Sequence, residues 1–410
     1  MEALDGAVSA FYRRWHDLEA AAERDAASVL DFDMCPWEGP PSLRPFPDRI
    51  AALAEAERLH AEVVASAEGE WHNKALILHK LRGAATYLRA LMGQRIPFAV
   101  AFEAMMGEPP RRVSEAEIQA DAARLAEALE AMGMELSARG YERYRALEVI
   151  DDLSAFEGQL RGEAARWVER IVARAGLTTP GLRTGAGATY RVEVADVDEY
   201  WSNWIDGSRD GGIRLRANLH PRVHYTRTSH VSLAAHEIGG HATHVLSLMS
   251  AERRGALDPC VLNLTVHGCE AFHMEGLAQA VVTLLGEAEE VPPGVALRDA
   301  MSDLHHALVD NAHLDLEAGA PIDEILDATC ARSPFLTRTS LAANLRDRGR
   351  HPLFRCYQAV YGPSRRLFRR LAALPALKRY ALMGELYQTV LTPAQLRARF
   401  EGALAAAGVA

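Results

Sequence analysis

Cysteine is scarce in this sequence, and no stretch stays apolar for long enough to cross a membrane. The 410 residues include five cysteines, and no two of them form a CxxC pair. Neither a thiolate zinc knuckle nor a disulfide framework is therefore expected. A membrane span needs ~20 predominantly apolar residues, and the N-terminus lacks the apolar core of a signal peptide. We expect a soluble, cytoplasmic protein without a membrane partner.

An excess of positive charge is also lacking. Lys and Arg number 45 against 55 Asp and Glu, which gives a formal net charge of −10. Nucleic-acid binding needs a concentrated basic field, so we expect no nucleic-acid partner. The basic exception is the run Arg365, Arg366, Arg369 and Arg370, whose spacing is typical of a solvated helix face.

Helix-forming residues dominate the composition. Ala, Leu, Glu and Arg are abundant, and all four favour helices. Helical signals stop in the Gly- and Thr-rich stretch 177–190, and residues 213–218 then alternate apolar and polar side chains as a short strand does. We predict a mainly α fold with one small β element. Residues 1–176 form an N-terminal helical region and residues 177–410 a second region, and together they make one bilobal unit.

The clearest chemical signal lies in residues 231–249, which read VSLAAHEIGGHATHVLSLM. This apolar helix carries His236, Glu237, His241 and His244. Polar groups crowded into an apolar helix are costly unless something uses them. Neutral imidazole is a good ligand for zinc, so a zinc site that includes His236 and His241 is the natural explanation. A core helix decorated with polar groups and free of metal is the structural alternative.

The spacing of the two histidines departs from the common HExxH motif. His236 and His241 are five residues apart, which gives HExxxH. Five residues of an ideal α-helix turn through about 500°, so the two rings would point apart. A π-bulge would bring them together, and Gly239 and Gly240 make such a distortion sterically easy. We expect the helix to be distorted at these glycines.

A third ligand is needed, and a carboxylate on a following helix would supply it. The segment CEAFHMEGLAQAVVTLL, residues 269–285, is a second apolar helix that contains Glu275, 34 residues after His241. Glu270 is the fallback. Glu237, adjacent to a ligand, would act as the general base that takes a proton from water.

These segments resemble known metallopeptidases. HEIGGH at 236–241 and MEGLA at 274–278 resemble the HEIGTH-type and QEGLA elements of the microtubule-associated tyrosine carboxypeptidase family. The resemblance implies that His236, His241 and Glu275 bind zinc and that Glu237 is catalytic. It covers residues 230–285, and the family's C-terminal Arg/Gly-rich and Lys-Asp elements are missing.

The flanks resemble a second group, uncharacterised bacterial helical metallopeptidase-like proteins with HExxPGH and EGW motifs. The similar segments are 206–220, 309–327 and 351–367. Both groups resemble the wider set of helical gluzincins. The resemblance implies a gluzincin-like fold with a central cleft and a strand beside the zinc helix. It also implies Tyr or His groups from the C-terminal half that stabilise an oxyanion.

Further candidates follow from this picture. Tyr357, Tyr361 and His313 are candidate oxyanion donors, although packing aromatics and core histidines look the same in sequence. The backbone of Arg216, Ala217 and Asn218 could align an extended peptide by strand addition. Arg365 or Arg366 could hold a substrate carboxylate. His305 and His306 are more typical of surface or core histidines.

These residues together predict a zinc-dependent peptidase acting on short or unstructured peptides, with a carboxypeptidase as one candidate form and residues 177–410 as its catalytic region. One alternative is a non-catalytic peptide- or metal-binding protein on the same scaffold. Another is a di-iron centre, but that needs an ExxH pair, and Ala278 occupies the position three residues after Glu275. The oligomeric state is left open.

Overall fold

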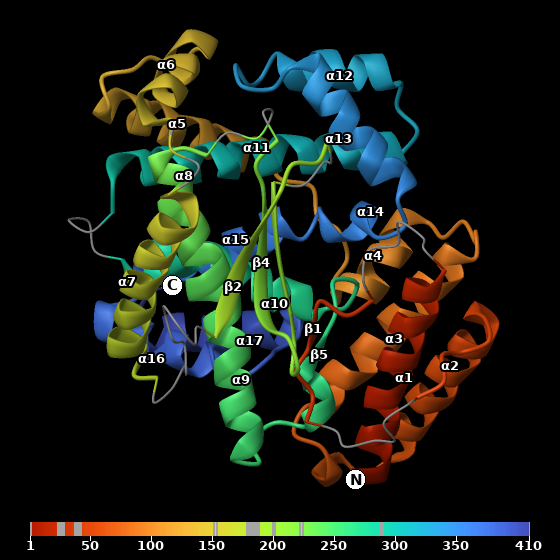
Figure 1. Ribbon diagram of the computed structural model, residues 1–410. Coiled ribbons are helices and arrows are strands. Elements are labelled where there is room, and N and C mark those ends of the chain that lie inside the picture. The colour runs from red at the N-terminus through yellow and green to blue at the C-terminus, as the bar shows by residue number, and fades with distance from the viewer. Residues whose placement is uncertain are drawn as a thin grey trace.

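The computed structural model describes residues 2–22, 29–36, 43–150, 152, 155–177, 189–198, 202–220, 223, 225–286 and 291–409. It is mainly helical with one small sheet, as predicted (Figure 1). The helices of the first half are α1 (Glu2–Ala21), α2 (Arg49–Ala65), α3 (Lys74–Leu91), α4 (Phe98–Met106), α5 (Glu115–Ala131), α6 (Ala138–Glu148) and α7 (Phe156–Ala175). Most of the stretch 177–190, where helical signals stop, lies outside the described residues.

The second half is also helical. Its helices are α8 (Arg227–Leu233), a π-helix (Ala234–Ala242), α9 (Thr243–Arg253), α10 (Glu270–Leu285), α11 (Pro293–Glu317), α12 (Ile322–Cys330), α13 (Arg338–Arg350), α14 (Phe354–Tyr357), α15 (Tyr361–Arg369), α16 (Ala376–Leu386) and α17 (Pro393–Ala406). Short 3₁₀ turns cover Glu68–Glu70, Pro259–Leu262 and Arg370–Ala373. No helix in the described ranges is both long enough and apolar enough to span a bilayer.

Local sequence signals set many of the helix ends. Ser114 and Glu117 form a capping box at the start of α5. Thr226 with Ser229 makes the same reciprocal bonds before α8. Side-chain oxygens at these positions satisfy backbone N–H groups that have no partner inside the helix. Gly107 and Gly176 end α4 and α7 with φ values of +84° and +66°, a conformation that favours glycine.

The sheet has five strands in the order β2-β4-β3-β1-β5. These are β1 (Phe32–Asp33), β2 (Tyr190–Ala195), β3 (Asn203–Ser208), β4 (Gly212–Asn218) and β5 (Asn263–Leu264). Strands β3 and β4 form an antiparallel hairpin, and β2 pairs with β4 in parallel. The sequence indicated β4 alone. Because β1 and β5 have two residues each and pair over long sequence distances, no local pattern reveals them.

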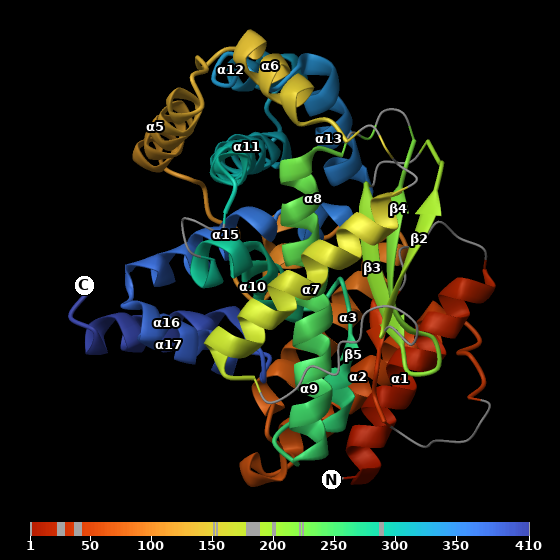
Figure 2. The same cartoon turned by 60° about the vertical axis from the view of Figure 1, so that its left-hand side comes forward.

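Two apolar clusters stabilise the fold. The larger one joins both predicted regions, since it contains Trp15 and Trp167 from the first and Ile238, Leu277 and Tyr387 from the second. The smaller one lies between α5, α11, α12 and α13, which gather at one end of the molecule in Figure 2. This shared core is consistent with the two regions forming a single unit. The predicted boundary between them at residue 176 stays a prediction.

Candidate metal centre

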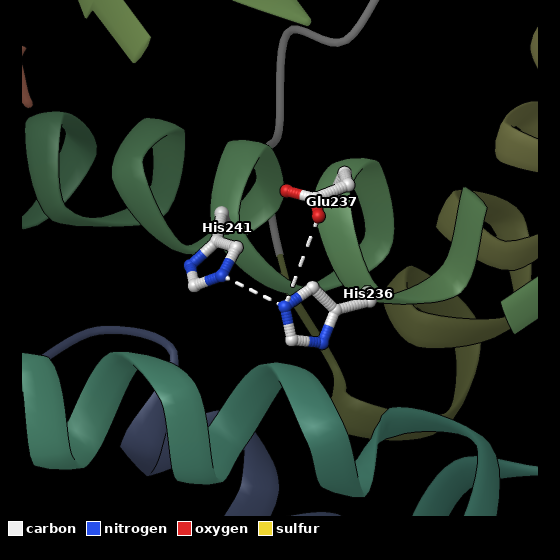
Figure 3. A group of neighbouring side chains, drawn as sticks. All are labelled: His236, Glu237 and His241. Carbon is white, nitrogen blue, oxygen red and sulfur yellow. Dashed lines mark hydrogen bonds and ion pairs between the residues drawn. The ribbon is translucent and has the colours of Figure 1, made fainter. Parts of the chain in front are cut away.

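The centre is built on a run of three helical segments, α8, the π-helix and α9. The π-helix covers Ala234–Ala242 and therefore contains the whole HExxxH motif. In a π-helix the hydrogen bonds join residues five apart, so residues at that spacing lie on one face. The Nε2 atoms of His236 and His241 accordingly lie 3.2 Å apart, and the two ring planes are nearly perpendicular, at 81° (Figure 3). The expected distortion is present and spans more than the two glycines.

Packing against α10 holds the π-helix in place. A Cβ atom at Gly240 would lie 2.5 Å from the Cβ of Ala278, so only glycine allows this close approach of the two helices. The Tyr387 hydroxyl donates a hydrogen bond of 2.9 Å to the carbonyl oxygen of Gly239. The Thr243 hydroxyl donates one of 2.8 Å to the carbonyl of Ile238. These donors bond carbonyl groups in the segment where the α-helical pattern is interrupted.

Helix α10 brings Glu275 to the two histidines. Its Oε2 atom lies 3.5 Å from His236 Nε2 and 3.8 Å from His241 Nε2. Ligand atoms about 2.0–2.1 Å from a tetrahedral zinc ion are about 3.3–3.4 Å from one another. The three donor atoms are therefore spaced as a zinc ligand set requires, within the few tenths of an ångström that a bound ion would adjust.

A pair of tyrosines orients Glu275. Tyr357 donates a hydrogen bond of 2.7 Å to Glu275 Oε1, and Tyr361 donates one of 2.8 Å to the Tyr357 hydroxyl. Within the described residues Glu275 Oε2 is buried and has no hydrogen-bond partner, and the same holds for His241 Nδ1. One carboxylate oxygen is thus fixed by the protein, while the other faces the histidines.

The electrostatics of the centre favour a cation. Burial lowers the pKa of His236 to about 3 and that of His241 well below its usual value. Both rings are therefore neutral near pH 7, as metal ligands must be. Burial raises the pKa of Glu275 to about 7, and burial and the charge of Glu275 raise the pKa of Glu237. A divalent cation among these groups would offset the cost of keeping two buried carboxylates ionised.

Glu237 also lies close to the histidines, and it competes with Glu275 for the role of third ligand. One donor atom each from His236, Glu237 and His241 fits within 4.8 Å, and Glu237 Oε1 is 3.9 Å from His236 Nε2 (Figure 3). That same oxygen accepts a hydrogen bond from Asn203 Nδ2 on β3. Because Glu275 Oε2 is nearer to His236 and has no hydrogen bond to any described residue, the geometry favours Glu275 over Glu237 as a candidate ligand.

The centre opens into a cavity of about 400 Å³. The candidates His236, Glu237, His241, Glu275, Tyr357, Tyr361 and Arg365 all line it. Sequence reasoning missed Asn203 and Arg298 and treated His306 as a surface or core residue, yet all three line the cavity. His306 stacks on Tyr361 with ring centroids 5.8 Å apart. Asn and Arg residues are common on helices and strands everywhere, so no local signal marks these positions.

The structure does not place His313, a predicted oxyanion donor, at the cavity. Its ring is buried against Phe98, with centroids 4.6 Å apart, and it does not line the cavity. Asp310, one turn earlier, bonds to the buried Arg348 at 2.8 Å. Both residues lie on the face of α11 that packs inside the protein.

The two arginines proposed for a substrate carboxylate also need correction. Arg365 lines the cavity, but its guanidinium bonds to Asp303 at 2.7 Å and to Asp299 at 3.1 Å. Arg366 does not line this cavity and bonds to Asp121 at 3.0 Å instead. Internal carboxylates therefore occupy the groups that were expected to meet a substrate.

The predicted substrate-aligning strand is wrong as well. Arg216, Ala217 and Asn218 belong to β4, which is paired with β2 on one side and β3 on the other. Their backbone groups are used within the sheet and cannot add another strand. The strand that borders the cavity is β3, whose Asn203, Trp204 and Ile205 are lining residues.

The remaining candidates lie outside the centre. Glu270, the fallback ligand, is fully buried and accepts a hydrogen bond of 2.6 Å from Lys80. His244, one turn after His241, is buried with its Nε2 3.0 Å from the carbonyl oxygen of Thr389. Both are held by structural contacts and do not line the cavity.

The comparisons with known proteins identify similar folds only. No family model and no curated protein matches the chain. Among solved structures it is similar to a "putative lipoprotein" from Colwellia psychrerythraea, at 13% identity and a TM-score of 0.52, with 86% of this chain and 66% of that chain covered. It is also similar to a "putative lipoprotein of unknown function" from Shewanella oneidensis, at 13% identity and a TM-score of 0.48, covering 86% and 72%. The chain thus spans just under two thirds of the first of these structures.

These neighbours correct the functional prediction. The sequence predicted a peptidase acting on short peptides, with a carboxypeptidase as one form. The solved structure that shares its fold at a TM-score of 0.52 is named as a putative lipoprotein, and that name does not mention a peptidase. The assignment to protease or carboxypeptidase activity is therefore withdrawn. The alternative of a non-catalytic binding protein on a peptidase scaffold gains no support from the neighbours either.

Proposed function

We propose that this protein binds one zinc ion through His236, His241 and Glu275 and that the centre performs hydrolytic chemistry on a small substrate held in the cavity. The observation that carries the proposal is the position of Glu275 Oε2, which has no hydrogen-bond partner among the described residues and lies 3.5 and 3.8 Å from two neutral imidazole nitrogens. Two nitrogen atoms and one carboxylate oxygen are a ligand set found in catalytic zinc sites, which keep a position open for water or substrate.

The roles of the other residues follow from their contacts. Zinc, when bound, supplies Lewis acidity and brings the pKa of a water molecule towards neutrality. Glu237 is next in sequence to a ligand and is oriented by Asn203, so it can accept a proton and later return it to a leaving group. Tyr357 holds the ligand Glu275, and Tyr361 extends that hydrogen-bond chain along the cavity wall.

Part of the cavity wall is apolar. Apolar side chains of Leu233, Met274 and Phe354 lie beside the polar centre. A volume of about 400 Å³ falls in the range of ~300–1,000 Å³ that is usual for small-molecule sites. We therefore propose a small substrate with a bond open to attack by water, such as an acyl ester.

The test begins with metal content and continues with turnover. Purified protein should contain about one zinc per chain by elemental analysis. Zinc-loaded protein should hydrolyse a chromogenic ester such as 4-nitrophenyl acetate, and a chelator should stop the reaction. Glu237→Gln should keep the zinc but lose ~10²–10⁴-fold in rate, because glutamine cannot accept the proton.

Asp31→Asn provides a useful comparison, because this carboxylate also lines the cavity but is bonded to Trp204 Nε1 at 2.9 Å. It should keep a rate closer to that of the wild-type protein. Absence of zinc after loading and dialysis would refute the metal centre. Zinc-loaded Glu237→Gln with the wild-type rate would refute the proposed role of Glu237 alone.

A further inference from the structure

A second cavity of about 420 Å³ is lined by residues from α5, α15 and α17, and it is strongly basic. Helix α15 contributes to both cavities, since Tyr361 and Arg365 line the first while Arg366 and Arg369 line the second. Six arginines line the second cavity: Arg111, Arg124, Arg366, Arg369, Arg370 and Arg397. Three carboxylates, Glu108, Glu117 and Asp121, line it too, so the lining residues carry a charge of 6 − 3 = +3.

Buried carboxylates neutralise the inner arginines only in part. Asp121 is shared between Arg124, Arg366 and Arg369, and its side chain is 2% exposed. Asp303, just outside the lining, is shared between Arg124 and Arg369. Three guanidinium groups therefore share ion pairs with only two carboxylates. Asp303 also forms an ion pair with Arg365, which lines the first cavity. The inner wall keeps an excess of positive charge.

One guanidinium nitrogen on this wall is unused. Arg366 bonds to Asp121 through Nη1, but its Nη2 is buried and has no hydrogen-bond partner in the described parts of the chain. A buried N–H donor on a charged group is costly when it stays unbonded. Arg370 also lines the cavity, is exposed, and makes no ion pair with any described residue. Both arginines are among the residues that line the cavity.

The remaining ion pairs and the apolar side chains of the lining help to define the ligand. Arg397 bonds to Glu108 and Arg111 to Glu117, each at 2.6 Å, so these arginines are neutralised locally. The apolar lining consists of small and aliphatic groups such as Val113, Pro363 and Leu367, with no aromatic ring among the described lining residues. A nucleobase would have nothing to stack on. The cavity fits a compact and highly charged ligand.

We propose that this second cavity binds a compact phosphate-bearing anion, held by the guanidinium groups of Arg366, Arg369 and Arg370. Guanidinium groups match the geometry of phosphate oxygens and bond to them in pairs. A salt-bridge network built only to join α5 to α15 would pair its charges evenly. The excess charge and the unused Nη2 of Arg366 distinguish a binding site from such a network. The proposal does not depend on zinc binding or hydrolysis.

Calorimetric titration with pyrophosphate, at an ionic strength held constant with sodium chloride, tests the proposal. Wild-type protein should show saturable binding with about one site per chain. Arg366→Gln should weaken the affinity about tenfold or more, since a charged hydrogen bond is lost. Arg370→Gln removes an exposed charge and should weaken the affinity about two- to fivefold.

Two controls keep the result interpretable. Arg399→Gln removes an arginine of the same helix α17 whose partner is Glu385 and which does not line the cavity, so it should bind as the wild type does. Citrate should bind more weakly than pyrophosphate. If Arg366→Gln fails to fold, Arg370→Gln still decides. Absence of saturable binding, equal binding by the Arg370→Gln variant, or citrate binding as tight as pyrophosphate would each overturn the phosphate site.

Discussion

The two carboxylate oxygens of Glu275 have different surroundings, and this difference fits the proposal that one oxygen binds the metal while the other anchors the side chain. Oε1 accepts the hydrogen bond from Tyr357, and Oε2 faces His236 and His241. A partner that fixes a ligating carboxylate reduces the entropy lost when the metal binds. Tyr357 should therefore act as a positioning residue for the metal.

This role leads to a graded prediction for zinc affinity. Glu275→Ala should lose most of the zinc, because a ligand is removed. Tyr357→Phe should keep the site but weaken zinc binding ~10–100-fold, as is usual when a supporting partner of a ligand is lost. Competition with a chromogenic zinc chelator measures both. Tyr380→Phe, on α16 outside the cavity, should match the wild type. Wild-type affinity in Tyr357→Phe would show that the tyrosine does not position Glu275.

The grouping of site residues was predictable where a motif concentrates them. His236, Glu237, His241 and Glu275 were expected to lie together because polar groups in apolar helices are costly unless something uses them, and all four line one cavity. Asn203 and Arg298 were missed because they come from elements distant in sequence, and their meaning depends on which side of a helix or strand faces the cavity. Residue type and spacing do not carry that information.

At the scale of secondary-structure elements, the contact between the π-helix and α10 sets the geometry of the candidate centre. Gly240 lies against Ala278, three residues after the proposed ligand Glu275. An alanine at position 240 would bring its Cβ within 2.5 Å of the Ala278 Cβ and 2.6 Å of its backbone Cα. Backbone cannot move aside as a flexible side chain does, so the two helices must separate.

Gly240→Ala should therefore reduce both stability and zinc affinity. Overpacking of this kind typically costs ~1–3 kcal/mol in the free energy of unfolding. Chemical denaturation of the zinc-free protein measures the loss. Gly158→Ala is the matched control, because Gly158 lies in α7 and a Cβ atom added there would have nothing within 4 Å. That change should stabilise the helix by ~0.5–1 kcal/mol. Equal stability of the two variants would contradict the close-packing argument.

The helical fold and the distortion of the helix that carries His236 and His241 could be predicted from the sequence. The strand pairing of the sheet could not. The HExxxH spacing led to the π-helix, because two ligands five residues apart leave few other solutions. The sheet arises from pairings such as Phe32 with Leu264 and Gly207, which no local pattern encodes. The error about the cavity strand has the same origin, since the order β2-β4-β3 places β4 in the interior of the sheet.

At the scale of the whole molecule, a buried histidine joins the N-terminal helices to the second half of the chain. His267 is fully buried, 4.9 Å from the ring centroid of Trp15 in α1 and 5.0 Å from that of Tyr87 in α3. Neither of its ring nitrogens has a hydrogen-bond partner among the described residues. Burial, and then the nearby charge of Lys80, lower the pKa of His267 to about 3.

This low pKa makes folding sensitive to acid. Above pH ~6.5, the usual value for histidine, His267 is neutral in both the folded and the unfolded chain. Below it the unfolded chain takes up a proton that the folded protein cannot accept until about pH 3. The free energy of unfolding should therefore fall by up to about 1.4 kcal/mol per pH unit from this residue as the pH drops through that window. The other charged groups near the ring are Lys80 and Glu270, which form a buried ion pair with each other in the folded protein.

The prediction is that His267→Phe flattens the dependence of stability on pH between about 6 and 4. Phenylalanine fills the same aromatic pocket and takes up no proton in either state, so the contribution from His267 disappears. Urea denaturation of zinc-free protein at several pH values measures the slope, and removal of zinc keeps metal release out of the comparison. His72→Gln changes an exposed histidine instead and should leave the slope as in the wild type. A His267→Phe variant that folds and loses stability with acid as steeply as the wild type would show that this buried ring does not control the acid response.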